Sequence, residues 1–229
     1  MGGTDLYEIL PLPNRALPTT TVISISGKVV DENNQPIEAE IAWQELDTGK
    51  TLGKLYSKAT TGEFFITLPV GKEYAFYAKK EGYFNISERI DLKSQKKYSI
   101  KATNFQLNSY QSTIKNKKEI VLNNIFFGSN SDKLNPSSFA ELNRLVDVLL
   151  KNEEMKIEIQ GHSDDVGNAD NNMALSEKRA KSVQGYLLGK GVPSEKISAK
   201  GYGQTKPAFP NDSDEHRAKN RRVSFTASN

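Results

Sequence analysis

Residues 161–183 read GHSDDVGNADNNMALSEKRAKSV, a stretch that combines an acidic pair, a polar loop and the start of a helix. Asp164 comes directly after an expected strand, and Arg179 lies about two turns into the helix expected from Asn172 to about Lys190. The glycine and asparagine residues between them favour turns. Because such a loop can fold back over the start of the helix, we expect Asp164 and Arg179 to lie close together.

A neighbouring Asp and Arg can recognise a small molecule that carries both charges. Asp164 would receive an ammonium group, and Arg179 would hold a carboxylate through two parallel N–H bonds, a geometry that Lys does not offer. Asn172 could supply a donor and an acceptor together. Taken alone, these residues also fit a structural salt bridge, since most Asp–Arg pairs are structural.

A metal site and a hydrolase site are two alternatives that would use the histidines of the second half of the chain. A metal could use His162 with the neighbouring aspartates, but a zinc site needs more histidines and the EF-hand spacing is absent. A Ser-His-Asp hydrolase would need His162 or His216 beside a nucleophile, and the chain contains no G-x-S-x-G stretch. The absence of cysteine excludes thiol catalysis and disulfides. We therefore expect a site without metal or cofactor, and a protein that is not an enzyme.

The second half of the chain reads as one α+β domain around this stretch. Asn135 followed by Pro136 indicates a helix start, and apolar residues follow at helical spacing. Expected strands lie before this helix, on either side of the helix after the acidic pair, and at the C-terminus. The order predicts a small mixed sheet with helices on one face.

The first half alternates with a period of two between turns rich in Asn, Asp, Gly and Pro. About seven short strands at this spacing predict an all-β sandwich. We expect an extended lead-in over 1–20, the sandwich over 21–103, a linker over 104–118, in which an edge strand is possible, and the α+β domain over 119–229.

The stretches SGKVVDENNQPIEAEIAW (26–43) and TTGEFFITLPVGKEYAFYAKKEGY (60–83) resemble a carboxypeptidase-regulatory-like, or transthyretin-like, module. The resemblance covers about 80 residues and implies a β-sandwich. It does not imply a peptidase, because residues 1–117 contain no histidine for a zinc site.

A longer resemblance covers the second half. The stretches from NNIFFGSNSDKL (123–134) through GHSDDVG and NMALSEKRA to NRRV (220–223) resemble, in order, the OmpA-like peptidoglycan-binding domain. The resemblance implies that the ligand is the diaminopimelate of the peptide stem of Gram-negative peptidoglycan. It implies Asp164 and Arg179 as the main ligand pair, Asn172 as a further contact, and Asn130 and Arg221 as weaker ones. His216 and Ser224 depart from the family pattern, which puts the edge of the pocket in question.

The resemblance also implies a periplasmic, outer-membrane-associated protein that anchors an envelope assembly to the wall. The alternative is a scaffold whose sandwich docks an envelope protein partner, with wall binding weak or lost. With a net charge of +3 over 229 residues, we expect no nucleic-acid partner, and no stretch is apolar for long enough to form a transmembrane segment. The start, DLYEILPLP (5–13), resembles the end of an upstream repeat domain, so we expect a piece of a longer protein.

Overall fold

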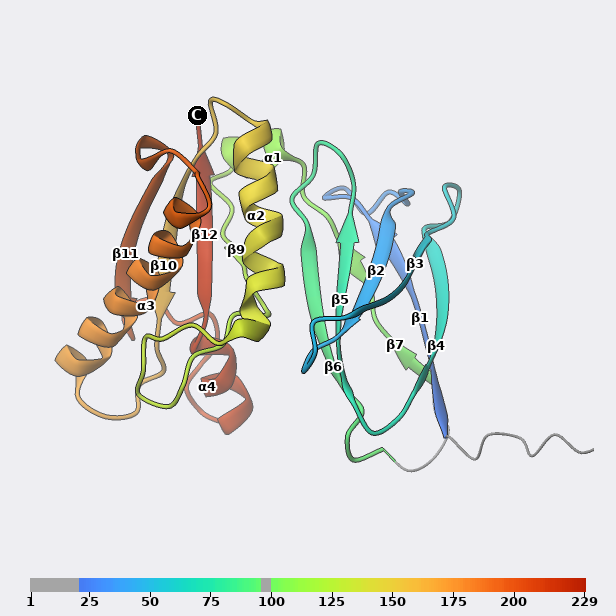
Figure 1. Cartoon of the computed structure of the whole chain (residues 1–229), viewed down its shortest axis with the longest axis horizontal. Helices are drawn as coiled ribbons and strands as arrows, with labels where there is room; N and C mark the ends of the chain where they lie inside the picture. The colour runs from blue at the N-terminus through green and yellow to red at the C-terminus, as the bar shows by residue number, and fades with distance from the viewer. Residues whose placement is uncertain (1–20, 96–99) are drawn as a thin grey trace, which may run out of the picture.

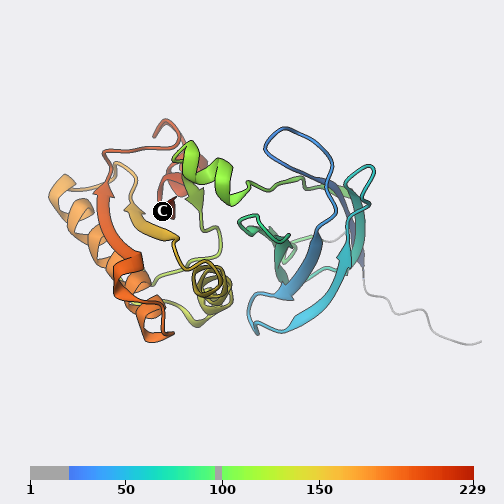
Figure 2. The ribbon, with the colours of Figure 1, turned by 90° about the horizontal axis from the view of Figure 1, so that it is seen from above.

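The computed structural model describes residues 21–95 and 100–229, which form two layered units side by side (Figure 1). The predicted lead-in over 1–20 lies outside the described residues. The first unit consists of strands, and the second combines a sheet with helices. In the view from above, helix α2 (Phe139–Lys151) is seen end-on between the two units (Figure 2).

The first unit contains two four-stranded sheets. One has the order β4-β1-β7, with β8 also paired to β1, and the other has the order β3-β2-β5-β6. The strands are β1 (Val22–Val30), β2 (Glu40–Glu45), β3 (Thr51–Tyr56), β4 (Glu63–Pro69), β5 (Glu73–Lys79), β6 (Ile86–Asp91), β7 (Ile100–Ala102) and β8 (Phe105–Gln106). The predicted all-β character therefore holds for the described part of this unit.

One apolar core lies between these two sheets. Ile25 from the first sheet and Phe76 from the second are both fully buried in it. Strand β5 is buried on both faces, because Tyr74, Phe76 and Ala78 face this core while Ala75 and Tyr77 face the second unit. A strand that is covered on both sides reads as an almost continuous apolar run, as EYAFYAK does here.

The segment from 104 to 118, expected as a linker, is folded. Phe105 and Leu107 are fully buried in the core of the first unit, and β8 pairs with β1 in parallel. Helix α1 (Tyr110–Lys115) follows, with the side chain of Ser109 accepting a hydrogen bond from the Ser112 N–H as its N-cap. The edge strand allowed for in this segment is thus present, and the chain has no free tether here.

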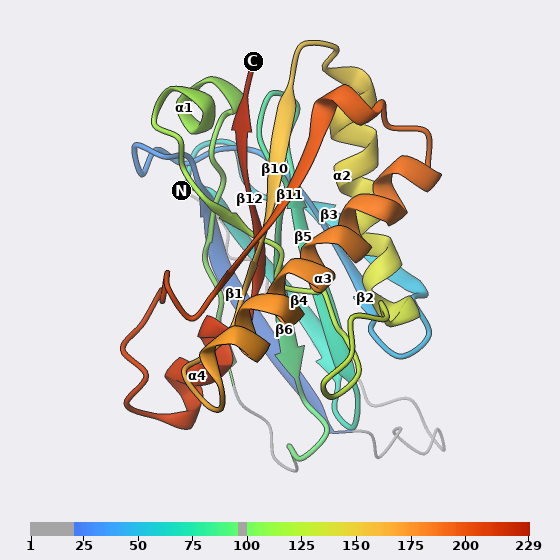
Figure 3. The same ribbon diagram turned by 90° about the vertical axis from the view of Figure 1, so that its left-hand side faces the viewer.

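The second unit has a mixed sheet of order β11-β10-β12-β9, in which β10 is parallel to β11 and antiparallel to β12. The elements are β9 (Ile120–Val121), the 3₁₀ turn η1 (Pro136–Ser138), α2, β10 (Lys156–His162), α3 (Ala169–Gly189), the 3₁₀ turn η2 (Ser194–Lys196), β11 (Ile197–Gly203), α4 (Asp214–Asn220) and β12 (Val223–Ser228). Helix α3 crosses the sheet diagonally, and α2 lies beside it (Figure 3). None of the helices in the described ranges is long and apolar enough to cross a membrane.

The predicted helix starts are close to those observed. Asn135 caps η1 by accepting from the Ser137 N–H, and Pro136 occupies the first helical position. The second helix begins at Ala169, earlier than expected, because the side chain of Asn168 caps it by accepting from two backbone N–H groups. Asn172 therefore lies inside the first turn of α3 rather than at its start.

Candidate functional site

An open pocket of about 600 Å³ lies where β10 ends, between the first turns of α3, the loop after β9 and the region of α4. All five side chains singled out in the sequence line it: Asn130, Asp164, Asn172, Arg179 and Arg221. The fold therefore brings together the three residues proposed from the local sequence, Asp164, Asn172 and Arg179, and the two that only the family resemblance implied, Asn130 and Arg221.

Helix α3 comes close to the sheet beside the pocket because two glycines face it. A Cβ on Gly161 would lie 2.1 Å from the Ser176 carbonyl oxygen, and one on Gly201 would lie 2.5 Å from the Glu177 nitrogen. Glu177 adds a hydrogen bond, since its carboxylate accepts from the Gly201 N–H at 2.5 Å. The side chains of α3 are thereby held directly over the ends of β10 and β11.

Asp164 is held at the base of the pocket by backbone on both sides of its strand. The Ser163 N–H donates to the Gly203 carbonyl, and the His162 N–H donates to the Arg222 carbonyl. The carboxylate of Asp164 lies 2.5 Å from Nη1 of Arg221 and also accepts from the Val166 N–H. Its side chain is only 10% exposed, so the acid is largely shielded while its Arg221 partner reaches solvent.

Arg179 also lines the pocket, and its hydrogen-bond and ring partners among the described residues are neutral. Its Nε donates to the Ser131 carbonyl at 3.0 Å, and its guanidinium lies over the Phe127 ring, 5.0 Å from the ring centre. It makes no ion pair with any of the described residues. Burial lowers the pKa of the Arg179 guanidinium, and the positive charge of Arg221 lowers it further. Within the part of the chain that the structure describes, neither terminal nitrogen of Arg179 has a hydrogen-bond partner, so both can receive an anion.

The expected proximity of Asp164 and Arg179 takes a different form from a direct pair. Asp164 pairs with Arg221, and Arg179 lines the same pocket without an ion pair to Asp164. The simple structural salt bridge between Asp164 and Arg179 is therefore not what the structure contains. The pocket instead presents two ion pairs, Asp164–Arg221 and Asp214–Arg217, and one guanidinium, that of Arg179, which makes no ion pair among the described residues.

Asn172 and Asn130 shape the rim. The Asn172 side chain donates to the Asp164 and Val166 carbonyls and to Oε1 of Gln204, so it ties the loop after β10 to the loop after β11. Asn130 is exposed and has a positive φ of 48° in a turn of the loop after β9. Its side chain is thus presented at the pocket mouth rather than in its base.

Asp214 and Arg217 also line the pocket and were not singled out as site residues from the sequence. They form an ion pair of 2.6 Å within α4. Asn220, fully buried, fixes this region by accepting from the Ala208 and Phe209 N–H groups. The sequence feature that points to this region is the group of basic residues from Arg217 to Arg222, which lies within the stretch that resembles the OmpA-like domain.

A buried polar cluster lies beneath the pocket. Arg222 donates to Glu119 at 3.0 Å, and His162 stacks on Tyr202 and lies 3.3 Å from Oγ of Ser224. Burial, together with the charge of Arg222, lowers the pKa of His162 to about 4. Burial acts to raise the pKa of Glu119, but hydrogen bonds from Arg222 and Ser224 hold it below its ordinary value.

The two departures from the family pattern lie outside the pocket lining. Ser224 is fully buried in this cluster, and His216 pairs with Asp212 and stacks on Phe209. Among the described residues, no three His, Asp or Glu side chains gather closely enough to hold a metal ion. The expectations of no metal and no cofactor remain predictions.

Comparison with known proteins matches the OmpA family over residues 126–221. The outer-membrane lipoprotein YfiB of Pseudomonas aeruginosa is 37% identical over 101 residues, which are 44% of this chain and 60% of that protein. The peptidoglycan-associated lipoprotein of Buchnera aphidicola is 36% identical over 120 residues, which are 52% of this chain and 68% of that protein. The chain belongs to the OmpA family.

The OmpA family region contains every pocket residue that the sequence had singled out, from Asn130 to Arg221. Among solved structures, the C-terminal domain of Helicobacter pylori MotB is 31% identical, with a TM-score of 0.43, over 46% of this chain and 83% of that one. The chain spans 60% of the length of YfiB. The first unit lies outside the OmpA family match.

Proposed function

We propose that the pocket binds cell-wall peptidoglycan non-covalently through the diaminopimelate of the stem peptide, and that the protein is not an enzyme. The observation that carries the proposal is Arg179, a half-buried guanidinium without an ion pair among the described residues, which lines the same open pocket as the Asp164–Arg221 pair. A free amino-acid centre has the two charges that these walls complement.

The ligand carboxylate would be held by Arg179 in a bidentate arrangement, because both of its terminal nitrogens are free while Nε is occupied by Ser131. The ligand ammonium would approach Asp164 and share it with Arg221. Asn172 holds the loop that carries Asp164, and Asn130 offers an amide at the mouth. Arg221 is thus a partner of the acid as well as a possible second contact to a carboxylate.

The family supports the same ligand class. One relative is named a peptidoglycan-associated lipoprotein and another an outer-membrane lipoprotein. We propose by analogy that this chain works in the periplasm, associated with the outer membrane, and ties an envelope assembly to the wall. Fold-level analogy alone would be weak, so the charged pocket is the main support.

The first unit is proposed to be a carboxypeptidase-regulatory-like sandwich that acts as a spacer or as a dock for an envelope protein. We keep 21–103 and 119–229 as the proposed domains, with 104–118 as the folded connection between them. If the sandwich contact is the main function and wall binding is lost, the protein is a scaffold instead.

Purified peptidoglycan sacculi separate these two possibilities. Retention of the protein on sacculi, without release of soluble fragments, is expected for a wall anchor. Absence of retention would favour the scaffold, and steady release of fragments would indicate an enzyme.

A titration then tests the pocket itself, using a peptide that contains diaminopimelate. Arg179→Ala is expected to weaken binding by about 30-fold, or ~2 kcal/mol, because no other cation replaces it on that wall. Lys181→Ala is the matched control, since Lys181 is on the same helix but is exposed and pairs with Glu177. Equal affinities of wild type and Arg179→Ala would remove Arg179 from the site.

A further inference from the structure

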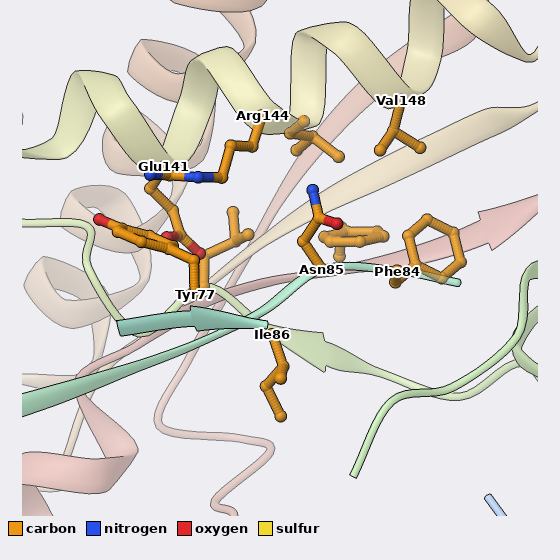
Figure 4. Close-up of a pocket in the computed structure, with 10 residues that line it drawn as sticks. Tyr77, Phe84, Asn85, Ile86, Glu141, Arg144 and Val148 are labelled. Carbon is orange, nitrogen blue, oxygen red and sulfur yellow. The ribbon is translucent and has the colours of Figure 1, made fainter. Parts of the chain in front are cut away.

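The outer face of the β5–β6 sheet is docked against the second unit. The Ser87 hydroxyl on β6 donates to the Glu141 carboxylate on α2 at 2.7 Å, and the Asn123 amide donates to the Ser87 carbonyl at 2.6 Å. Figure 4 shows Arg144 extending from α2 across the ring of Tyr77, with its guanidinium 3.1 Å from the ring centre. These contacts fix α2 and the segment before it to the sandwich.

The contact between the outer face of β5 and β6 and helix α2, with Ser87, Tyr77, Glu141 and Arg144, is here called the joint. Apolar side chains at the joint are part of a hydrophobic core. Phe84, at the sandwich end of the joint, is 3% exposed and belongs to the core of the second unit. Its ring meets those of Phe225 and Tyr110 edge-on, with centres 5.2 and 4.8 Å apart. Because one ring is shared in this way, the two units cannot separate without exposing core surface.

Two consecutive phenylalanines connect this joint to the pocket. Phe126 packs against Leu46, Ala75 and Tyr77 of the sandwich. Phe127 lies under the Arg179 guanidinium. Both residues line the pocket, so this short segment contacts the sandwich through Phe126 and supports the Arg179 guanidinium through Phe127.

The backbone between these two sides is firmly held. The Phe126 N–H donates to Oγ of Ser138, and the Phe126 carbonyl accepts from the Asn135 N–H. The loop then turns through residues 128–131, where the Ser131 carbonyl receives the Arg179 Nε–H. A shift of Phe126 would therefore also move the Phe127 ring and the Ser131 carbonyl, which orient the Arg179 guanidinium.

The sandwich side of Phe126 is covered by Arg89 on β6. The Arg89 guanidinium lies 5.4 Å from the centre of the Phe126 ring. It is held there by an ion pair with Glu73, a carboxylate that also accepts from Lys93 at 3.0 Å. A planar guanidinium can pair with an acid and cover an aromatic face at the same time, which a lysine ammonium does less well.

We propose that Arg89 of the sandwich is a positioning residue for the pocket, acting through Phe126 on the loop of residues 126–131 that holds Arg179. The expected effect on ligand binding rests on the proposed function. The effect of Arg89 on the position of the Arg179 side chain does not. The sandwich is then more than a spacer, because Arg89 on β6 determines the orientation of Arg179, a proposed ligand-binding residue of the second unit.

The test uses the full chain with two variants that remove the ring–guanidinium contact in different ways. Arg89→Lys keeps a cation beside Glu73, and Phe126→Leu keeps apolar volume in the joint. Lys93→Met is the matched control, because it removes the other cation on Glu73 without touching Phe126. The Nε–Hε resonance of Arg179, assigned by its loss in Arg179→Lys, reports the hydrogen bond to Ser131 directly.

Both variants are expected to move this resonance, and to weaken binding of the diaminopimelate peptide by roughly threefold or more, while Lys93→Met does neither. A change in melting temperature alone would reflect a structural role only, and it would leave the resonance in place. A resonance that stays at its wild-type position in either variant overturns the proposal, as does affinity within twofold of wild type. If wild type itself does not bind the peptide, the proposed function fails, and the resonance still decides the positioning.

Discussion

Two buried carboxylates in this molecule have contrasting partners. Asp164 in the pocket lies 2.5 Å from the Arg221 guanidinium. Glu141 in the joint accepts from the Ser87 hydroxyl, and it makes no ion pair within the part of the chain that the structure describes. Burial raises the pKa of Glu141, although the hydrogen bond from Ser87 opposes the rise. The two acids therefore differ in their partners: Asp164 lies beside a guanidinium, whereas Glu141 accepts from a hydroxyl.

The contrast follows the roles of the two regions. In the pocket, the acid that is proposed to receive the ligand ammonium lies beside an arginine, Arg221. In the joint, burial raises the pKa of Glu141, and the rise favours the neutral acid over a buried charge. Three predictions follow from the largest effect to the smallest; the first and the third test the two sides of this contrast, and the second tests the polar cluster of His162 and Glu119.

The first prediction removes the charge of Asp164 without changing its size. Asp164→Asn is expected to weaken binding of the diaminopimelate peptide by about 30-fold, or ~2 kcal/mol, because the ligand ammonium loses its acid and Arg221 is left unpaired. Isothermal titration calorimetry measures the change. Acetylating the ligand ammonium should cost wild type much of its affinity and cost the variant little. Equal losses in the two proteins would show that Asp164 does not receive the ammonium.

The second prediction concerns the cluster beneath the pocket. With a pKa lowered from 6.5 to about 4, folded His162 stays neutral over a range in which the unfolded chain binds a proton. Unfolding then takes up a proton, so the free energy of unfolding falls as the pH is lowered from about 6.5 to 4, by on the order of 2 kcal/mol. Glu119, with its lowered pKa, adds a further loss only below 4.5.

Urea unfolding at a series of pH values measures this slope. His162→Phe keeps a ring stacked on Tyr202 but does not titrate, so its stability should change less between pH 6.5 and 4.5. An unchanged slope in His162→Phe would assign the pH dependence to other groups.

Asp164 and Arg179 could be found from the sequence because one follows the end of a predicted strand and the other lies on a predicted helix, whereas Asn130 and Arg221 came only from the family resemblance. Asp164 comes directly after β10, and Arg179 lies on the face of α3 that turns toward the pocket. Their detailed partners could not be found in this way. Arg221 reaches Asp164 only because buried Asn220 fixes the loop around Phe209, and this contact joins residues far apart in the chain.

For the fold as well, the sequence predicts local elements but not the contacts between distant segments. Period-two alternation predicted the strands of the sandwich, and the Asn135–Pro136 pair predicted the first helix start. Residues 104–118 were expected to form a linker because β8 has only two residues, too few for a pattern, although Phe105 is fully buried. The docking face of β5 and β6 was also missed, since alternation shows that Tyr77 is apolar but not what covers it.

The third and smallest effect is expected in the joint. Glu141→Gln should stabilise the protein at pH 7 by about 1 kcal/mol, because the amide keeps an oxygen for the Ser87 hydroxyl and carries no charge to bury. Oε2 of Glu141 and the Asn124 amide lack hydrogen-bond partners among the described residues. A glutamine amide can donate to the Asn124 oxygen, which a carboxylate cannot do.

The pH dependence distinguishes this explanation from simple repacking. Since the folded-state pKa of Glu141 lies above its ordinary value of 4.5, the stability it contributes is fully present below 4.5 and is lost as the pH rises through the folded pKa. The advantage of Glu141→Gln should therefore be small at pH 4 and grow toward pH 7 in thermal unfolding. Glu153→Gln, an exposed position just after α2, should show no such growth. An advantage that is equal at both pH values would mean that Glu141 is not held neutral by its burial, and the contrast with Asp164 would then lose its electrostatic basis.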